Sequence, residues 1–402
     1  MNILHVLAGM DPKLGGVCQA VRTMANGLID LGVTNEVVSL DAADSSFLKD
    51  DLFPVHALGP ASGPWSYSPR LLPWLVENLC RFDVVIVHGL WLYYGHAVKK
   101  AIQSETVRRQ LKEKQKVGST TKLFVMPHGM LDPYFQRAPG RKLKALRNWA
   151  YWKLIESKLV EQADGLLFTC EEELLLARKP FRPYHPKREL NVGLGIEHPP
   201  AFSRDMTESF LKKCPEVRDQ PYILFLSRIH EKKGVDLLIS AYAKVYEKGS
   251  PKLVIAGPGY DSPYGQKLKE LINENGKIKD AVLFPGILSG DSKWGAFYGC
   301  DAFVLPSHQE NFGIAVAEAL ACCKPVLISN QVNIWREIQE GNGGIVAADT
   351  IEGTIDLLER WKNLNTDKRI EMATDAGKLF ERSFAIASVA SNLMISLGRE
   401  KF

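Results

Sequence analysis

The chain has 402 residues, of which 46% are hydrophobic and 24% are charged, and its formal net charge is +4. This composition is typical of a globular protein with two or more domains, and the charge is too small to predict a nucleic-acid partner. No apolar run reaches the ~18–20 residues that a membrane-spanning helix needs. The seven cysteines show no paired spacing, which favours reduced thiols in a cytosolic protein.

The chain opens with MNILHVLAGMDPKLGG, which has no basic leader and whose apolar run breaks at Gly9 and Asp11. We therefore expect a first buried strand and no secretory signal. Short apolar runs then alternate with helical periods, which is typical of parallel sheets covered by helices. In the first half the predicted strands are 2–7, 36–40, 83–88, 122–127 and 164–169, and the predicted helices are 17–31, 69–81 and about 139–162.

The second half repeats this pattern, so we predict two successive doubly wound α/β units. Its predicted strands are 222–227, 252–257, 281–286, 301–306 and 324–329, and its predicted helices are about 234–247, 264–275, 291–299 and 313–322. The stretch 194–222 has no strong periodicity and is the expected linker. Two such units form a cleft, and ligands of open α/β sheets bind outside the carboxyl ends of the strands, so the loops after strands are the candidate sites.

The segment 137–158 interleaves Trp149, Tyr151 and Trp152 with lysines and arginines. Such a segment can lie on an anionic membrane surface. The alternative is an ordinary amphipathic helix whose aromatic residues face the core.

Two loops have glycines or basic residues where a phosphate group can bind. Arg228 follows the strand 222–227, and Lys233 precedes a helix, whose N-terminus attracts anions such as a diphosphate. Gly15 and Gly16 follow the first strand and allow close approach of backbone amides to a phosphate. The pattern is not G-x-G-x-x-G, which argues against a NAD-dependent dehydrogenase. Solvated basic residues and sterically required glycines remain the alternatives.

Two strand ends carry histidines, His88 in VHGLW and His128 in MPHGMLDP. A histidine at this edge can exchange a hydrogen bond with a bound hydroxyl. A structural role is the alternative for each of them.

The most specific stretch is SHQENFGIAVAEAL, 307–320. Glu310 falls in a loop after a strand, and the next three residues are expected to begin a helix with unsatisfied amides that can bind oxyanions or hydroxyls. These residues are Asn311, Phe312 and Gly313. Glu318 lies eight residues beyond Glu310, ~12 Å along a helix, which is too far for most acid/base pairs of carboxylates, ~5–10 Å apart.

The two glutamates therefore predict contacts with opposite ends of one extended ligand, and carboxylates accept well from sugar hydroxyls. Because 314–321 is otherwise apolar, an unpaired Glu318 would be costly, and a ligand is its expected partner. The alternative is a capping role for Glu310 and an exposed or paired Glu318.

These motifs resemble those of the family 4 retaining glycosyltransferases, which have the GT-B fold. SRIHEKKGVDLLI, VIAGPG, LFPGIL, DAFVLPSHQENFGIAVAEALACCKPVLIS and GNGGIVA stand in the family's order, and the first half adds HGLW, HGML and ADGLLFTCEEE. The resemblance covers nearly the whole chain. Within the family, the motifs resemble particularly those of bacterial enzymes of surface and exopolysaccharide biosynthesis. It departs at NVGLGIE, 191–197, in the joint between domains.

The resemblance implies an acceptor domain at 1–198, a nucleotide-sugar domain at 199–379 and a last helix within about 380–402 that packs on the first domain. It implies that Arg228 and Lys233 neutralise the diphosphate and that Gly15 and Gly16 touch it. Glu310 with the amides of Asn311, Phe312 and Gly313 would hold the transferred sugar, and His128 would contact it or the acceptor. Glu318 would bind the ribose, and the backbone at Ile287 and Leu288 the base.

The implied activity is metal-independent, retaining transfer of a sugar from a nucleotide donor, with UDP the first expectation and GDP the second. The acceptor would be a glycan or a lipid-linked saccharide, and no cofactor or nucleic acid is expected. The expected location is cytoplasmic, with peripheral contact at the inner face of the cell membrane. The alternatives on the same fold are a nucleotide-sugar epimerase, a phosphorylase and a non-catalytic nucleotide-sugar-binding protein.

Overall fold

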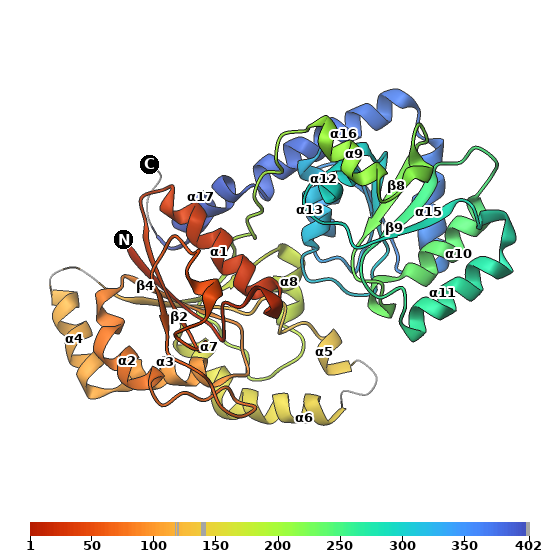
Figure 1. Ribbon diagram of the computed structural model, residues 1–402. Helices are drawn as coiled ribbons and strands as arrows, with labels where there is room; N and C mark the ends of the chain where they lie inside the picture. Colours follow the sequence, from red (N-terminus) through yellow and green to blue (C-terminus); the bar gives the residue numbers. More distant parts are fainter. Residues whose placement is uncertain (117, 119, 138–141, 399–402) are drawn as a thin grey trace. The chain divides into compact units, whose positions relative to one another are not determined.

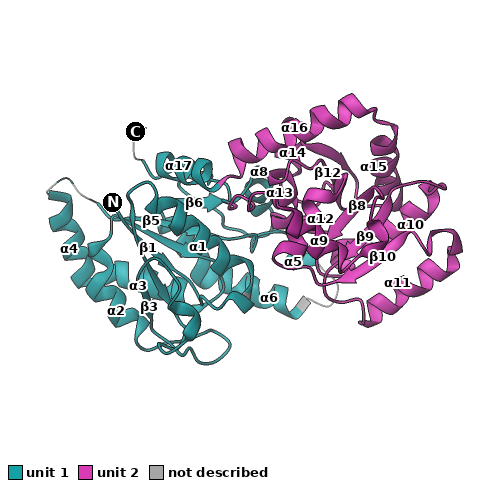
Figure 2. Cartoon of the chain, turned by 45° about the horizontal axis from the view of Figure 1, so that its top comes forward, with its two compact units in different colours: residues 1–195, 386–402 teal, residues 196–385 magenta. Residues whose placement is uncertain are grey.

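The computed structural model describes all residues except 117, 119, 138–141 and 399–402 (Figure 1). The chain divides into two compact units, which Figure 2 distinguishes by colour. Unit 1 consists of Met1–Gly195 and the C-terminal segment that begins at Ile386, and unit 2 is Ile196–Ala385. Each unit is built on one parallel sheet covered by helices, so the predicted α/β class is confirmed.

The sheet of unit 1 has the strand order β3-β2-β1-β4-β5-β6-β7, and all neighbours are parallel. The strands are β1 (Asn2–Val6), β2 (Thr34–Ser39), β3 (Val55–Ala57), β4 (Val84–His88), β5 (Lys122–Met126), β6 (Gly165–Phe168) and β7 (Glu189–Asn191). The two edge strands were not predicted. Each has three residues and no fully buried side chain, so no apolar run marks it.

The helices of unit 1 cover both faces of this sheet. They are α1 (Gly16–Ile29), α2 (Leu71–Asn78), α3 (Tyr93–Gln103), α4 (Glu105–Lys116), α5 (Tyr134–Arg137), α6 (Lys142–Tyr151), α7 (Ser157–Gln162), α8 (Glu171–Ala177) and α17 (Ile386–Ser396). The single helix predicted at 139–162 is interrupted by a π-helical turn, Trp152–Glu156, and its residues 139–141 lie outside the described part. Helix α17 packs beside α1, where Leu393 and Met394 join the core formed by Ile3 and Leu28.

The sheet of unit 2 has the order β10-β9-β8-β11-β12-β13 and is also parallel throughout. Its strands are β8 (Tyr222–Leu226), β9 (Lys252–Ala256), β10 (Val282–Gly286), β11 (Ala302–Leu305), β12 (Val326–Ser329) and β13 (Gly344–Ala347). Its helices are α9 (Arg204–Leu211), α10 (Val235–Val245), α11 (Pro263–Glu274), α12 (Asp291–Gly299), α13 (Ile314–Ala321), α14 (Trp335–Glu340), α15 (Ile351–Asn363) and α16 (Thr366–Ser383).

The joints between the units differ from the prediction in one respect. The expected linker 194–222 contains α9, which packs tightly on α12, since a Cβ at Gly295 would lie 2.0 Å from the carbonyl oxygen of Met206. The helix within 380–402 is α17, which begins at Ile386 and packs on α1. Before it, after the end of α16, the carbonyl of Phe384 accepts a hydrogen bond from the amide of Ile196 at 2.8 Å. The two passages of the chain between the units therefore pair side by side.

Candidate active site

The strand order of unit 2 reverses between β8 and β11, its two central strands. At such a switch point the loops after the two strands diverge, and ligands of doubly wound sheets bind there. The loop after β8 carries Arg228 and Lys233, and the loop after β11 carries Glu310. The sheet topology thus brings together three residues that are up to 82 positions apart in the sequence (310 − 228).

Backbone contacts hold these two loops against each other. The carbonyl of Lys232 accepts hydrogen bonds from the amide of His308 and from the hydroxyl of Ser307, both at 2.8 Å. Gly234 has a left-handed φ of 65°, and a Cβ there would lie 2.1 Å from the carbonyl oxygen of Pro306. Only glycine allows this approach, so the packing of the loops explains Gly234.

Lys233 and Glu310 form an ion pair, with 11% and 24% of their side chains exposed. Arg228 is exposed, and no described residue forms an ion pair with its guanidinium. The site therefore presents one paired and one available cation beside a carboxylate, which is a suitable environment for a diphosphate next to sugar hydroxyls.

The backbone of Glu310 is anchored on both sides. Its amide donates to the carbonyl of Gln331 at 2.9 Å, and its carbonyl accepts from the amide of Asn333 at 3.0 Å. This bridging pair continues the sheet into the loop. The carboxylate of Glu310 therefore projects from a rigid base, which suits a residue that must orient a ligand.

The turn after Glu310 differs from the prediction in one respect. Helix α13 begins at Ile314, so Asn311, Phe312 and Gly313 precede the helix and do not form its first turn. Gly313 caps the helix with a left-handed φ of 85°, and Phe312 is buried with its ring against that of Phe384. The backbone N–H groups of Phe312, Gly313 and Ile314 have no acceptor among the described residues, so they remain available for an oxyanion or hydroxyl.

Glu318 has a protein partner, whereas a ligand was the partner expected from the sequence. Lys293 of α12 approaches it with 2.8 Å between Nζ and Oε1, and 16% of the Glu318 side chain is exposed. The pairing weighed as the alternative for this residue is therefore present, and the contact of Glu318 with a ligand stays a prediction. Sequence reasoning missed Lys293 because it comes from a neighbouring helix 25 residues earlier.

The loop after β10 contains the predicted base-binding residues. Leu288 is buried, whereas 60% of Ile287 is exposed.

In the loop after β9, close packing requires glycine at both Gly257 and Gly259. A Cβ at Gly257 would lie 1.9 Å from the carbonyl oxygen of Ser227, and a Cβ at Gly259 would lie 2.4 Å from that of Ile229. Their packing holds the loop that carries Arg228.

In unit 1 the strand order reverses between β1 and β4. Gly15 and Gly16 follow β1 at this switch point. Gly15 has a φ of 93°, and no atom lies within 4 Å of a Cβ built at either glycine. Unlike Gly234, neither glycine is required by packing within the described structure.

His128 occupies a tight turn after β5. The amide of Met130 donates to the carbonyl of Pro127 at 3.1 Å, and His128 has an unusual left-handed φ of 51°. Its Nε2 lies 3.0 Å from Nδ1 of His88. Burial lowers the pKa of His128 to about 4, so the ring is neutral at pH 7.

Sequence reasoning missed the residue that holds this turn. Glu173 of α8 is buried, and its carboxylate accepts from the amide of Gly129 at 2.5 Å and from the amide and hydroxyl of Thr169 at 2.7 and 2.6 Å. Burial raises its pKa. The only sequence signal was its place in ADGLLFTCEEE, which does not distinguish it from the glutamates on either side.

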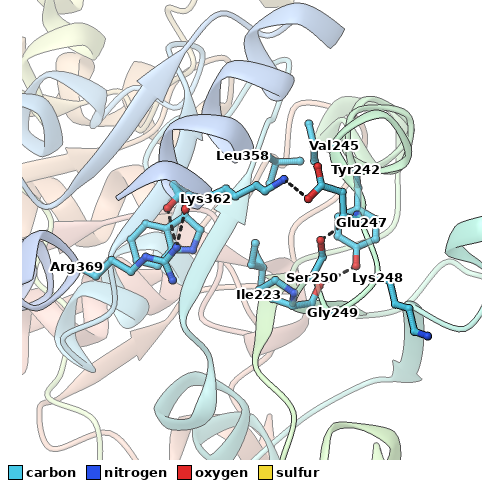
Figure 3. A pocket seen from close by; sticks show the side chains of 12 residues that line it. Ile223, Tyr242, Val245, Glu247, Lys248, Gly249, Ser250, Leu358, Lys362 and Arg369 are labelled. Carbon is cyan, nitrogen blue, oxygen red and sulfur yellow. Dashed lines mark hydrogen bonds and ion pairs between the residues drawn. The ribbon is translucent and has the colours of Figure 1, made fainter. Parts of the chain in front are cut away.

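A cavity of about 280 Å³ in unit 2 lies apart from these residues (Figure 3). Its lining includes Ile223 near the start of β8, Pro251 before β9 and Trp361 of α15, so it lies at the amino ends of the strands. Lys362 and Glu247 form an ion pair at its side, with 2.8 Å between Nζ and Oε2. The Nε1 of Trp361 forms no hydrogen bond with the described residues, but this nitrogen is also inaccessible to solvent. We therefore assign the cavity no role in this site.

The basic aromatic segment matches neither sequence alternative fully. Trp152 is completely buried and Tyr151 half-buried, as a core-facing helix requires. Other apolar side chains of the segment are exposed: Leu143 86%, Leu146 63%, Trp149 47% and Leu154 68%. Throughout the described residues, every helix is too short or too polar to cross a lipid bilayer.

Comparison with known proteins agrees with this architecture. Two family models match, one described as "Glycosyl transferase 4-like domain" over residues 15–188 and one as "Glycosyl transferases group 1" over 206–378. An uncharacterized glycosyltransferase of Methanocaldococcus jannaschii is 29% identical over 191 residues, covering 48% of this chain and 45% of that protein. The alpha-monoglucosyldiacylglycerol synthase of Streptococcus pneumoniae is 35% identical over 262 residues, covering 62% and 58%.

The chain thus spans about half the length of the curated relatives it matches. Among solved structures, the Anabaena protein HepE superposes with a TM-score of 0.71 over 100% of both chains at 17% identity, which shows a shared GT-B fold. The two family models lie one in each unit and together include the loops described above. The chain therefore belongs to the group 1 glycosyltransferases of the GT-B type, as its resemblance to family 4 predicted.

Proposed function

We propose that this protein transfers a sugar, with retention of anomeric configuration, from a nucleotide diphosphate donor to a glycan or lipid-linked acceptor. The observation that carries the proposal is the junction of Arg228, Lys233 and Glu310 at the switch point of unit 2. The same edge of the sheet holds the free amides before α13. Cations, amides and a carboxylate in one place match the chemical groups of a sugar diphosphate.

The roles follow from charge. Breaking the bond between the anomeric carbon and the diphosphate oxygen leaves negative charge on the diphosphate, which Arg228 and Lys233 stabilise. Glu310 accepts hydrogen bonds from hydroxyls of the departing sugar and, through its ion pair, keeps Lys233 in position. The acceptor oxygen bonds to the same face of the anomeric carbon, and its proton passes to the leaving diphosphate. This mechanism requires no protein nucleophile and no metal.

The rest of the donor occupies neighbouring loops. Glu318 accepts from the ribose hydroxyls, and Lys293 holds its carboxylate in position. The backbone at Leu288 meets the base. Gly15 and Gly16 leave open space beside the backbone amides of their loop, which suits a phosphate group of a substrate. UDP is the first candidate, because the similar Anabaena structures are described as complexes with UDP, UDP-glucose, or UDP and glucose.

A second proposal concerns the acceptor. One relative is named for the synthesis of a glucosyl-diacylglycerol, and the exposed side chains of α6 suit the surface of an anionic membrane. Leu146 and Trp149 are exposed on α6, and Lys153 lies 4.3 Å from the centre of the Trp149 ring. Apolar side chains with adjacent lysines are the arrangement of interfacial helices. We propose that this face brings the enzyme to a lipid-linked acceptor of surface polysaccharide synthesis at the inner membrane face.

The first experiment is a panel of UDP-, GDP- and ADP-sugars, with thermal stabilisation and release of free nucleotide as two readouts. We expect stabilisation and slow hydrolysis with one UDP-sugar. Release of no nucleotide but conversion of the donor into an isomer would indicate the epimerase. Stabilisation without any product, even with lipid-linked acceptors added, would indicate a non-catalytic binding protein, and no response to any donor would contradict the proposal.

A further inference from the structure

Four polar side chains form one hydrogen-bonded line through the core of unit 1. Nε2 of His5, in β1, lies 3.1 Å from Oδ1 of Asn35, in β2. Nδ1 of His5 lies 2.9 Å from Nε2 of His88, at the end of β4. Nδ1 of His88 lies 3.0 Å from Nε2 of His128, in the turn after β5. Asn35, His5 and His88 are buried, and only His128 reaches the partly exposed edge of the sheet.

Asn35 determines which group donates and which accepts in each hydrogen bond of this line. The side-chain nitrogen of Asn35 donates to the backbone carbonyls of Ala25 and Val33, at 3.3 and 3.1 Å. Because a carbonyl can only accept, the amide cannot be rotated by half a turn without facing two acceptors with its oxygen. Oδ1 of Asn35 must therefore accept, and His5 must carry its proton on Nε2.

The donor and acceptor nitrogens of the three histidines follow from this proton on Nε2 of His5. A neutral imidazole has one N–H donor and one acceptor nitrogen. If Nε2 of His5 is the donor, Nδ1 must accept from Nε2–H of His88. Nδ1 of His88 then accepts from Nε2–H of His128. The last nitrogen, Nδ1 of His128, is left with a lone pair, and no described residue forms a hydrogen bond with it.

This order of donors and acceptors requires that all three imidazole rings are neutral, and burial of the rings keeps them neutral. Desolvation lowers the pKa of His5 and of His128 to about 4, and that of His88 well below its ordinary value. A proton added to His5 or to His88 would also place two donors against each other within the line. The described histidines do not form a metal centre: they lie in a row, and no group of three metal-ligating side chains converges there.

The position of His128 is held independently of this line. Its left-handed φ of 51° is uncommon for a residue with a side chain. The carboxylate of Glu173 holds the amide of the next residue, Gly129, at 2.5 Å. Backbone and ring are thus both constrained, which is typical of a functional side chain whose orientation matters.

We propose that Asn35, His5 and His88 are positioning residues that present Nδ1 of His128 to the substrate as an obligatory hydrogen-bond acceptor. The inference rests on the proposed transferase function and adds a specificity to it. The group that His128 recognises must donate a hydrogen, as the hydroxyl of a neutral sugar does. A carboxylate in the same place, as in a uronic acid, would place an oxygen lone pair against the lone pair of Nδ1. The two would repel each other, so such a substrate would be rejected.

The direct test needs no substrate, so it is independent of the proposed function. The full chain is labelled with ¹⁵N-histidine, and proton–nitrogen couplings identify the protonated ring nitrogen of each histidine at pH 7. The signal that disappears in His128→Gln belongs to His128. We expect its proton on Nε2. A proton on Nδ1, or a doubly protonated ring, overturns the proposal.

A matched pair of variants tests the relay itself. In His88→Gln the amide can still accept from His128 and donate to His5, so His128 should keep its proton on Nε2. In His88→Leu the partner is lost, and His128 should populate both tautomers, with kcat/KM lower by about tenfold, the effect of one hydrogen bond to substrate. Equal tautomer populations in these two variants contradict the proposal.

A third variant acts at a distance from the substrate. Asn35→Leu removes the group that sets the direction, and we expect mixed tautomers at His128 although none of its own contacts has changed. Ser39→Ala is the control, because Ser39 is equally buried in β2 and its hydroxyl has no partner in the described part of the chain. A wild-type tautomer in a folded Asn35→Leu variant overturns the role of Asn35.

Discussion

Lys293 and Glu318 form an ion pair between two neighbouring helices of unit 2, with 2.8 Å between Nζ and Oε1. Both side chains are mostly buried, with 23% and 16% exposed. A fixed cation beside a partly buried carboxylate holds that carboxylate in one orientation. In the proposed function this pair prepares Glu318 to accept from ribose hydroxyls before the donor arrives.

Replacing Lys293 by methionine should therefore weaken donor binding without affecting the chemical step. Methionine keeps most of the length of the side chain but removes the charge, so Glu318 loses its orientation. We expect KM for the donor to rise about three- to tenfold, with kcat within about twofold of wild type. Steady-state kinetics with the identified donor measure both. An effect confined to kcat would contradict the assignment of Glu318 to the ribose.

Lys233 should affect the chemical step itself. In Lys233→Ala the leaving diphosphate loses a cation, and kcat should fall by about 10²–10³, the usual effect of removing one transition-state contact. Lys244→Ala is the control, because this exposed lysine lies in the last turn of the helix that follows Lys233. Turnover of Lys233→Ala at the wild-type rate would refute the charge-stabilisation mechanism.

Two glycines of apparently similar motifs should respond differently to alanine. Gly234→Ala places a Cβ against the carbonyl of Pro306, so we expect a lower melting temperature together with lost activity. Gly16→Ala meets open space, so the melting temperature should stay within about 1 °C, since Ala is the better helix former. Donor affinity should nevertheless fall, because a methyl group at this position crowds a phosphate that approaches the backbone amides. Unchanged affinity in Gly16→Ala would remove Gly16 from the site.

The stability of unit 1 should depend on pH through Glu156. Its side chain is fully buried, Oε1 accepts from the amide of Trp91 at 2.8 Å, and Oε2 has no partner within the described residues. Burial raises its pKa to about 7 from an ordinary 4.5. The folded state therefore binds the proton more tightly than the unfolded state, and stability is lost as pH rises from about 4.5 to 7.

Glu156→Gln removes this titration and keeps an oxygen for Trp91. We expect the variant to gain stability over wild type as pH rises, by about 2–3 kcal/mol in free energy of unfolding above pH 7, with the smallest difference near pH 4.5. Urea denaturation at pH 5, 7 and 8 measures the trend. A difference that does not change with pH would show that Glu156 is ionised in the folded protein throughout this range.

The membrane proposal predicts binding to vesicles through α6. The full chain should sediment with anionic phosphatidylglycerol vesicles and much less with phosphatidylcholine vesicles. Leu146→Asp with Trp149→Asp should abolish this binding, whereas nucleotide-sugar hydrolysis should stay near wild type. Leu52→Asp is the control, since Leu52 is even more exposed, at 77%, and lies in another part of unit 1. Equal loss of binding in the control would show that the effect is not specific to α6.

Much of the fold was predictable because the strands of parallel sheets are continuous apolar runs. Ten of the thirteen strands in the described residues were located from such runs. The three that were missed, β3, β7 and β13, are edge strands, and each has three residues that are not fully buried, so no continuous apolar run marks them. The linker prediction was wrong because α9 has an apolar face of only a few side chains, among them Met206 and Phe210.

The sequence by itself determined the α/β fold class and the residues that are candidates for binding and catalysis, because charge, glycine content and apolar periodicity are local properties. Tertiary structure decided which of them meet. The strand order brought Lys233 to Glu310, a neighbouring helix supplied Lys293 to Glu318, and three separate strands aligned His5, His88 and His128. The direction of that line depends on the backbone carbonyls beside Asn35. Such partnerships depend on distances between segments far apart in the chain, and no local pattern encodes them.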